Sequence, residues 1–181
     1  VMLMLKLDGL TVKLTYENGE LLEAATRGDG DEGEIITHNT RAISGIPSHI
    51  TYKERLVVRG EGFIRPSDFE ELKTSLQDSS GKPYKNGRNL AAGSIRLMDA
   101  KTCRERRLVF MPFGVLEGFP HLTRKSDKLR ELRALGFQPC KYLVTKQKLT
   151  LENVEAGIYQ LRQYATDKDI PIDGIVVSFN D

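Results

Sequence analysis

The N-terminal stretch has the alternating pattern of a half-buried strand. From residue 3 to residue 16, apolar side chains recur at every second position over most of the stretch, as expected for a strand with one face in the core. Asn18-Gly19 then predicts a type I′ hairpin turn, because both central residues of that turn adopt φ > 0. The register that follows pairs Glu17 with Glu20, Tyr16 with Leu21, Leu14 with Glu23, Val12 with Ala25 and Leu10 with Arg27.

This register places Arg27 on the same face of the hairpin as Lys6 and Asp8, because side chains alternate along a strand. Arg27 opens an acidic, glycine-rich loop over residues 28–34. An amine, a carboxylate and a guanidinium beside such a loop suit a phosphate-bearing substrate, since lysine and arginine bind phosphate oxygens. A surface hairpin with a solvated acidic loop would show the same pattern. The residues alone leave both interpretations open.

Further along the chain, strand and helix patterns interleave without a regular βαβ rhythm. The apolar run at residues 56–58 predicts a buried strand over residues 52–59 that ends at Gly60-Glu61, and residues 175–177 predict a last strand. Ser67 to Glu70 has the form of a capping box. The fold class expected is α+β, with antiparallel or mixed sheets flanked by helices. Three helices are predicted: one from Ser67 with Phe69, Leu72 and Leu76 on its apolar face, one from Ser126 to Leu135 with Ser126 as its candidate cap, and one from Thr150 to about Tyr164.

Composition narrows the class of protein without naming it. The chain has 181 residues, enough for one domain with its own core, and a net charge of +2 from 27 basic and 25 acidic residues. Contact with nucleic acid would therefore depend on local patches. No apolar run reaches the length of a membrane span, and we expect a cytoplasmic protein. Cys103 and Cys140 form no C-x-x-C pair, so we expect reduced thiols and no zinc site.

Three further charged residues are candidates for binding. Glu61 follows the predicted buried strand, where its carboxylate is either exposed at the strand end or desolvated in a site; exposure is the commoner outcome for glutamate. Arg88 and Arg96 bracket the small residues 91–94. They could flank a phosphate or a nucleic-acid strand, or they could be ordinary surface arginines.

Several motifs together resemble the adenylation domain of bacterial NAD-dependent DNA ligases. Lys6-Leu7-Asp8-Gly9 is similar to the K-x-D-G signature of covalent nucleotidyltransferases, although a tetrapeptide alone is a weak signal. The longer context is more specific and covers essentially the whole chain. In order, the segments that carry the resemblance are residues 6–16, 24–30 with Gly33-Glu34, 58–61, 88–96 and 172–177.

The resemblance implies adenylyl transfer through a covalent intermediate on the nucleotidyltransferase fold. Lys6 would attack the α-phosphorus of NAD, release nicotinamide mononucleotide and hold AMP as a phosphoramide. Mg²⁺ is the implied metal, although the motifs do not identify its ligands. The implied roles are Asp8 and Asp173 beside the amine or metal, Glu61 at the ribose, Arg27 and Arg88 at the sugar and phosphate, and Arg96 at the nucleotide site or DNA surface.

Two positions depart from the family pattern, and both fall on the adenine subsite. Two residues before the nucleophile the family carries a glutamate, where this chain has Met4. Five residues after Asp173 it carries a lysine, where this chain has Ser178. A thioether is a much weaker acceptor than a carboxylate for the exocyclic amine of adenine. We therefore expect weakened or relaxed adenine recognition.

The resemblance also predicts domain organisation and partners. Residues 1–181 would be an adenylation domain fragment that lacks the N-terminal domain for nicotinamide mononucleotide and the C-terminal OB, zinc-finger, helix-hairpin-helix and BRCT domains. Such a fragment would be a monomer that does not seal nicks by itself. The complete protein would act on nicked double-stranded DNA in replication and repair.

Two alternatives remain open from the sequence. One is a degenerate, non-catalytic nucleotide- or DNA-binding scaffold derived from a ligase, which would explain Met4 and Ser178 together. The other is an ATP-dependent ligase-like nucleotidyltransferase, although the segments 25–30 and 88–93 favour the NAD branch.

Overall fold

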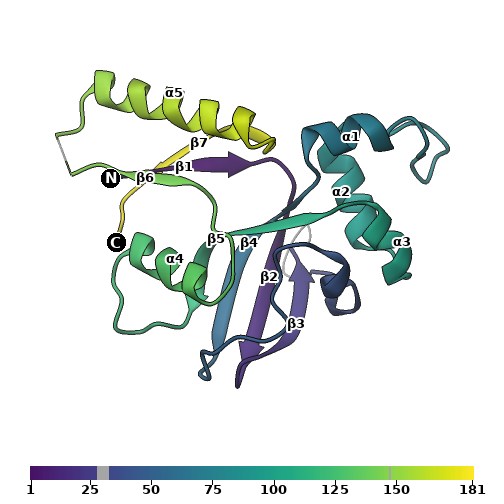
Figure 1. The fold of residues 1–181 in the computed structure, drawn as a ribbon, viewed down its shortest axis with the longest axis horizontal. Coiled ribbons are helices and arrows are strands. Elements are labelled where there is room, and N and C mark those ends of the chain that lie inside the picture. Colours follow the sequence, from purple (N-terminus) through teal and green to yellow (C-terminus); the bar gives the residue numbers. More distant parts are fainter. Residues whose placement is uncertain (28–32, 147) are drawn as a thin grey trace.

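The computed structural model describes residues 1–27, 33–146 and 148–181. Strands and helices alternate irregularly along these ranges, which confirms the predicted α+β class (Figure 1). The predicted glycine-rich loop falls mainly on residues 28–32, outside the described residues. The elements are β1 (Met2–Leu7), β2 (Leu10–Glu17), β3 (Glu20–Thr26), the 3-10 helix η1 (Thr37–Ala42), β4 (Leu56–Phe63), α1 (Pro66–Leu72), α2 (Gly87–Ile95), α3 (Ala100–Glu105), β5 (Val109–Glu117), α4 (Lys125–Ala134), β6 (Tyr142–Val144), α5 (Leu151–Asp167) and β7 (Ile172–Ser178).

The strands form two antiparallel sheets. The first has three strands in the order β6-β1-β7, and the second has four in the order β3-β2-β4-β5. The chain passes from the first sheet to the second between β1 and β2, over Asp8 and Gly9. The N-terminal stretch is therefore two strands in different sheets. The prediction of one continuous strand running from Lys6 into the hairpin was wrong.

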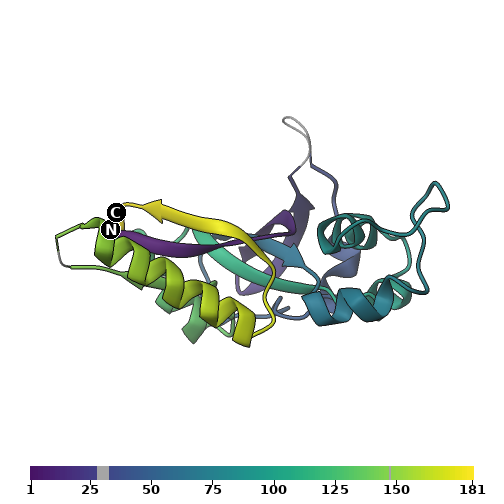
Figure 2. The ribbon, with the colours of Figure 1, turned by 90° about the horizontal axis from the view of Figure 1, so that it is seen from above.

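Helices cover the sheets in different places. Helix α5 lies along β1 on one face of the three-stranded sheet, and α4 packs against β5 (Figures 1 and 2). Leu3, Leu5 and Leu7 of β1 pack with Leu161 and Ala165 of α5 in one buried cluster. A larger cluster fills the space around the four-stranded sheet. Alternation along β1 therefore leaves its even-numbered side chains for the opposite face.

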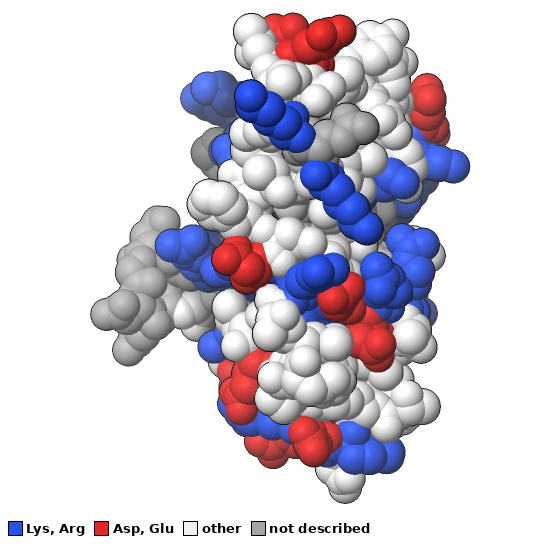
Figure 3. All heavy atoms as spheres, turned by 90° about the vertical axis from the view of Figure 1, so that its left-hand side faces the viewer, with Lys and Arg blue, Asp and Glu red and all other residues white. Residues whose placement is uncertain are grey.

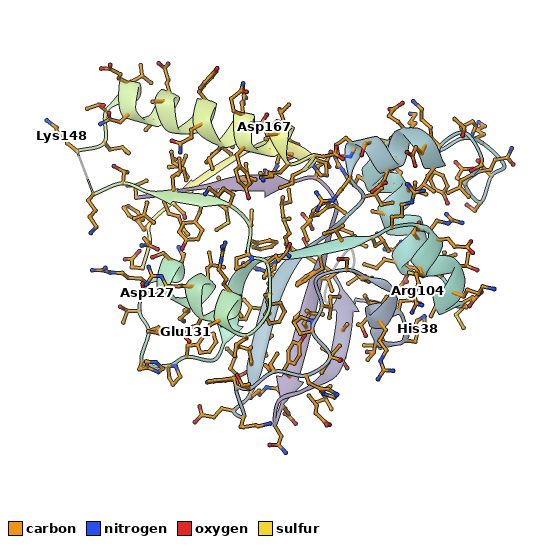
Figure 4. The ribbon with its side chains drawn as sticks, viewed as in Figure 1. His38, Arg104, Asp127, Glu131, Lys148 and Asp167 are labelled. Carbon is orange, nitrogen blue, oxygen red and sulfur yellow. The ribbon has the colours of Figure 1, made fainter. Side chains whose placement is uncertain are left out.

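Different elements form the two ends of the molecule. His38 of η1 and Arg104 of α3 lie at one end, and Lys148, just before α5, lies at the other (Figure 4). In the described part of the chain, no helix is long and apolar enough to cross a membrane.

The hairpin turn was predicted correctly, but the register was not. Asn18 and Gly19 have φ values of 51° and 81°, and Glu17 pairs with Glu20 as expected. A β-bulge between Thr15 and Tyr16 then shifts the pairing by one residue. A register shift of one residue moves the side chains of the shifted strand to the opposite face of the sheet. Beyond the bulge, Leu14 pairs with Ala24 and Val12 with Thr26, and the Arg27 amide donates to the Thr11 carbonyl at 3.0 Å.

Strand β4 begins and ends later than predicted. Gly60 and Glu61 lie inside it, where Glu61 pairs with Thr11 of β2 and with Met111 of β5. A Cβ atom on Gly60 would lie 2.5 Å from the Met111 carbonyl oxygen and from the Phe110 ring. Glycine therefore allows a close approach between β4 and β5 here, so the glycine that suggested a strand end is a packing requirement within the strand.

Two of the predicted helix caps were also wrong. The N-cap of α1 is Arg65, with Pro66 at the first helical position, and Ser67 instead donates its hydroxyl to Asp169. The N-cap of α4 is Arg124, and Ser126 lies within the helix. The predicted start of the third helix is confirmed, because α5 follows Thr150 directly. Thr150 is its N-cap, and its hydroxyl oxygen accepts from the Asn153 amide at 3.2 Å.

Gly9 marks the point where the chain changes sheets. A Cβ atom at this position would overlap the carbonyl oxygen of Gly62 in β4. The backbone of the turn thus lies directly against the second sheet, a contact that every other residue type would prevent.

We predict that Gly9→Ala lowers the free energy of unfolding by about 3 kcal/mol or more, because backbone must move to admit the methyl group. Urea denaturation followed by circular dichroism measures this. Gly114→Ala is the matched control, since a Cβ atom there meets nothing within 4 Å, and we expect a change below about 1 kcal/mol. Equal effects of the two substitutions would contradict the proposed contact.

Candidate functional site

Lys6 projects from β1 on the face opposite the buried leucines. Its position in the register is opposite Gly174 of β7, where a Cβ atom would lie 3.7 Å from the Lys6 Cδ atom. The lysine stem therefore runs beside backbone that carries no side chain. Its Nζ atom lies 3.4 Å from Oδ1 of Asp173, and the Lys6 side chain is 59% exposed. The amine is thus accessible and has a defined carboxylate neighbour.

Asp8 forms the second ion pair of the site. Its Oδ1 atom accepts from Nε of Arg88 at 2.7 Å, while its backbone amide donates to the Pro171 carbonyl at 3.0 Å. Arg88 comes from the first turn of α2, which begins at the N-cap Asn86. A carboxylate from the sheet junction therefore orients a guanidinium from a distant helix. An oriented guanidinium is suited to bind phosphate or carboxylate oxygens.

Glu61 is the most perturbed acid of the site. Desolvation by burial raises the pKa of its carboxyl to about 7, and the charges of Asp173 and Asp8 add to this rise. A hydrogen bond from Thr11 and the charge of Arg88 oppose it. The Oε1 atom is buried and has no hydrogen-bond partner among the described residues. A buried acceptor without a partner is costly, so this atom is prepared for a ligand that donates a hydrogen bond.

These side chains line one cleft of about 410 Å³ at the junction of the two sheets. One part of it is charged and the other is largely apolar. Arg59 and Phe113 face each other in its wall, with the guanidinium carbon 5.4 Å from the ring centroid. The residues that line the cleft are Met2, Met4, Leu5, Lys6, Leu7, Asp8, Gly9, Arg59, Glu61, Arg88, Phe113, Lys125, Asp173, Val176 and Ser178.

The cleft brings together most of the residues selected from the sequence. Two are elsewhere: Arg96 pairs with Glu34 through an Nε to Oε2 distance of 3.1 Å, and Arg27 is exposed at the end of β3. Neither is among the described residues that line the cleft. The predicted grouping of Arg27 with Lys6 rested on the wrong hairpin register. The others, Met4, Lys6, Asp8, Glu61, Arg88, Asp173 and Ser178, all line it.

Sequence reasoning missed three charged or aromatic residues that line the cleft, Arg59, Phe113 and Lys125. Arg59 and Phe113 lie in strands whose pairing the sequence does not reveal, and Lys125 directly precedes the helix predicted from Ser126. The sequence around each of these residues has the pattern of an ordinary strand or helix and does not indicate a binding role. In the described ranges, no group of three or more histidine, cysteine, aspartate or glutamate residues has the arrangement of a metal site.

Comparison with known proteins gives a consistent result along the chain. A family model described as the NAD-dependent DNA ligase adenylation domain matches residues 1–181. The DNA ligase of Lachnoclostridium phytofermentans is 36% identical over 178 residues, which cover 97% of this chain and 26% of that protein. The DNA ligase of Campylobacter concisus is 39% identical over 176 residues, covering 97% and 27%. The chain therefore spans about a quarter of the length of these curated relatives.

A solved structure titled "Pmar-Lig_Pre." has a similar fold. It superposes with a TM-score of 0.51 at 17% sequence identity, over 99% of this chain and 38% of that chain. At this identity the likeness concerns the fold alone.

We predict that the Glu61 carboxyl makes the protein less stable as pH rises. Its folded pKa of about 7 lies above the ordinary 4.5, so the native state binds more protons than the unfolded state between these values. The contribution of Glu61 to the free energy of unfolding is then most favourable below pH 4.5, and it falls by about 3 kcal/mol as pH rises toward 7. Glu61→Gln should remove this loss.

The measurement is urea denaturation of both proteins at several pH values between 4 and 8. The stability of the variant relative to the parent should increase across pH 4.5–7 and then level off. A difference that stays constant with pH would contradict the raised pKa. Asp78→Asn is a control. Hydrogen bonds from the Ser80 hydroxyl and the Lys82 amide hold the Asp78 pKa below its ordinary 3.8, so this carboxyl is ionised in both states over most of the range and the effect of its substitution should stay nearly constant with pH.

Proposed function

Because the chain belongs to the NAD-dependent DNA ligase adenylation domain family, we propose that Lys6 accepts AMP from NAD. The observation that carries this proposal is the accessible Lys6 amine in the cleft, 3.4 Å from Asp173. In the reaction the neutral amine attacks the α-phosphorus. A nitrogen–phosphorus bond forms, and the bond to the oxygen of nicotinamide mononucleotide breaks, with the electron pair leaving on that oxygen.

The charged end of the cleft supplies the groups that this step needs. The lysine nitrogen must lose a proton to attack, and the Asp173 carboxylate is the nearest acceptor, at 3.4 Å. Arg88, oriented by Asp8 at 2.7 Å, would bind the phosphate oxygens and stabilise the charge that develops on them. Asp8 is thus a positioning residue, whereas Lys6 and Arg88 contact the nucleotide.

Glu61 would bind the ribose. Its buried Oε1 atom has no partner among the described residues, and a sugar hydroxyl is a donor that can satisfy it. The atom can accept a hydrogen bond whether the carboxyl is ionised or has its proton on the other oxygen. The burial that raises the Glu61 pKa also strengthens a hydrogen bond to the sugar, because hydrogen bonds are stronger where water is excluded.

Mg²⁺ fits the carboxylates of the cleft as an ion carried by the substrate. Magnesium is usually held by one or two carboxylates together with substrate phosphates and water. The unpartnered oxygen of Glu61 is assigned to the ribose. Asp8 and Asp173 each pair with a basic group through Oδ1, so we propose that one of them would contribute a ligand through its second carboxylate oxygen. When bound, the ion would offset charge on the phosphates.

The sealing of nicked DNA would be the activity of longer proteins of this family. The curated relatives are named DNA ligase, and this chain spans about a quarter of their length. We propose that residues 1–181 carry out adenylylation and that DNA joining uses the additional length found in the relatives. The scaffold alternative differs in one respect that can be measured, namely that Lys6 would acquire no AMP.

We predict that incubation with NAD and Mg²⁺ adds one AMP to the protein. Intact-mass spectrometry would detect this adduct, and Lys6→Ala should abolish it because, among the described residues, no other lysine pairs with Asp173. Lys13→Ala is the control, since Lys13 is exposed on β2 and is not among the lining residues of the cleft. An adduct on the Lys6→Ala protein would exclude Lys6 as the acceptor.

The same experiment with ATP separates the alternatives. An adduct from NAD alone supports the proposal, an adduct from ATP supports an ATP-dependent relative, and no adduct from either supports a scaffold.

Base recognition should be relaxed at the apolar end of the cleft. Met4 lies opposite Val176, and Ser178 lies opposite Met2. These side chains offer apolar surface and one hydroxyl, but no carboxylate for the exocyclic amine of adenine.

We predict that Met4→Glu tightens NAD binding about tenfold, because a carboxylate acceptor is worth roughly 1.5 kcal/mol or more. Calorimetric titration with NAD and with its hypoxanthine analogue measures this, and only NAD binding should improve. A parent protein that already binds NAD tightly and rejects the analogue would contradict relaxed recognition.

A further inference from the structure

Asp173 lies at an irregular position in β7. Lys6 of β1 pairs with Gly174 and Leu7 pairs with Ile172, so Asp173 is an extra residue of β7 at the register shift. An extra residue of this kind forms a β-bulge, which takes its side chain out of the regular alternation of the strand. The direction of the Asp173 carboxylate therefore depends on how the residues before it are held.

The Asp173 side chain has space on two sides. It lines the cleft that contains Lys6, and it also lines a second hollow of about 740 Å³ beside the end of α5, together with Arg162, Asp169 and Ile170. The side chain is 34% exposed. The shape of the surface alone therefore does not force the carboxylate to point at Lys6.

The turn between α5 and β7 contains a residue in a left-handed conformation. Helix α5 ends in a Schellman motif, in which the Ile170 amide donates to the Ala165 carbonyl at 2.9 Å and the Asp169 amide donates to the Thr166 carbonyl at 3.2 Å. Asp169 has a φ of 56°, at the position of this motif where glycine is usual. Aspartate costs backbone free energy here, which indicates that its side chain has a use.

That side chain bonds to the start of α1, which lies beside the end of α5 (Figures 1 and 2). The Asp169 carboxylate accepts from the Ser67 amide at 3.2 Å and from the Ser67 hydroxyl. In return Arg65, the N-cap of α1, donates to the carbonyls of Lys168 at 2.8 Å and Asp169 at 3.3 Å. Arg65 and Asp169 thus form a clamp between elements that are 102 to 104 positions apart in sequence.

The clamp contrasts with the charged surface elsewhere on the molecule. On the side that carries both chain termini, lysine and arginine side chains are spread with acidic ones between them (Figure 3), which is typical of a solvated surface. At the end of α5, Arg65 and Asp169 instead have defined partners on another element. Charge at this end serves to hold the turn in place.

The residue that follows β1 holds the same turn from the opposite side. The Asp8 amide donates to the Pro171 carbonyl at 3.0 Å. The turn is therefore fixed at Asp169 by α1 and at Pro171 by Asp8, and one residue separates Pro171 from Asp173. A displacement of the turn at either point would disturb the 3.4 Å contact between Asp173 and the Lys6 amine.

We infer that Arg65 and Asp169 are positioning residues, which keep the Asp173 carboxylate directed at the Lys6 amine. The inference rests on the proposed function, in which Asp173 accepts the proton that Lys6 loses. Neither Arg65 nor Asp169 is among the described residues that line the cleft, so the clamp acts through the backbone of the turn. Its loss should slow AMP transfer and leave NAD binding intact.

Asp169→Gly separates this role from a role in folding, because glycine removes the carboxylate and suits the left-handed turn. The urea midpoint should stay within about 0.5 M of that of the parent protein. The rate constant for AMP transfer at saturating NAD, followed by intact mass, should fall about tenfold. The NAD concentration that gives half of this rate should change by less than about twofold.

Asp169→Asn should retain most of the rate, since asparagine tolerates the left-handed conformation and keeps one acceptor oxygen. Arg65→Ala removes the clamp from the α1 side and should slow the transfer by a factor similar to that of Asp169→Gly. Asp167→Asn is the matched control. Asp167 is the last residue of α5 (Figure 4) and has no part in the clamp, so removal of its charge should leave the rate unchanged.

A double-mutant cycle tests whether the clamp acts through Asp173. In an Asp173→Asn protein, Asp169→Gly should cause little further loss of rate, because the carboxylate that it positions is already absent. Amide hydrogen exchange, measured by nuclear magnetic resonance, tests the clamp without the reaction. In Asp169→Gly the Asp8 amide should exchange about tenfold faster as the turn loosens, whereas the Ile170 amide should keep its protection.

The inference is overturned if Asp169→Gly transfers AMP at the rate of the parent, if it slows transfer by the same factor with and without the Asp173 carboxylate, or if exchange at Asp8 does not change. A parent protein that gains AMP with no dependence on the clamp loses this inference alone. A parent that gains no AMP from NAD, but whose Asp8 amide responds to Asp169→Gly, loses the proposed function alone.

Discussion

The contact between Gly9 and the Gly62 carbonyl is the constraint on which the site depends. It lets the chain leave the three-stranded sheet after β1 and enter the four-stranded sheet at β2 within two residues. The turn places Lys6 and Asp8 at the junction, beside Glu61 from β4 and Asp173 from β7. The same geometry explains why a lysine, an aspartate and a glycine occur at this spacing: the first carries the amine, the second orients Arg88, and the third permits the turn.

The electrostatics of the cleft follow from this junction. Each sheet contributes carboxylates to a space that excludes part of the solvent, so burial and like charge both raise the pKa of Glu61. Lys6 and Arg88 compensate Asp173 and Asp8, whereas the buried Oε1 atom of Glu61 lacks a partner among the described residues. The charged end is therefore balanced except at the atom assigned to the sugar. The far end has the opposite character, with apolar side chains and a single ammonium from α4.

How much could be predicted from the sequence depended on whether a residue acts locally. The Asn18-Gly19 turn, the α+β class and the helix start at Thr150 follow from short-range rules, and the structure confirms them. The bulge at Thr15 is not encoded in a local pattern, and it moved Arg27 away from its predicted face. The serine caps failed because Arg65 and Arg124 hold the cap positions, while Ser67 and Ser126 bond to distant Asp169 and Asn180. Lys125 was missed because only the tertiary fold brings α4 to β7.

The most direct measurement is the location of the nucleotide after reaction with NAD. Peptide mapping by mass spectrometry would identify the modified side chain, and acid lability would identify a phosphoramide. This account predicts AMP on the peptide that contains Lys6 and no modification of Lys125 or Lys13. An acid-labile AMP on any other lysine, with Lys6 unmodified, would contradict it.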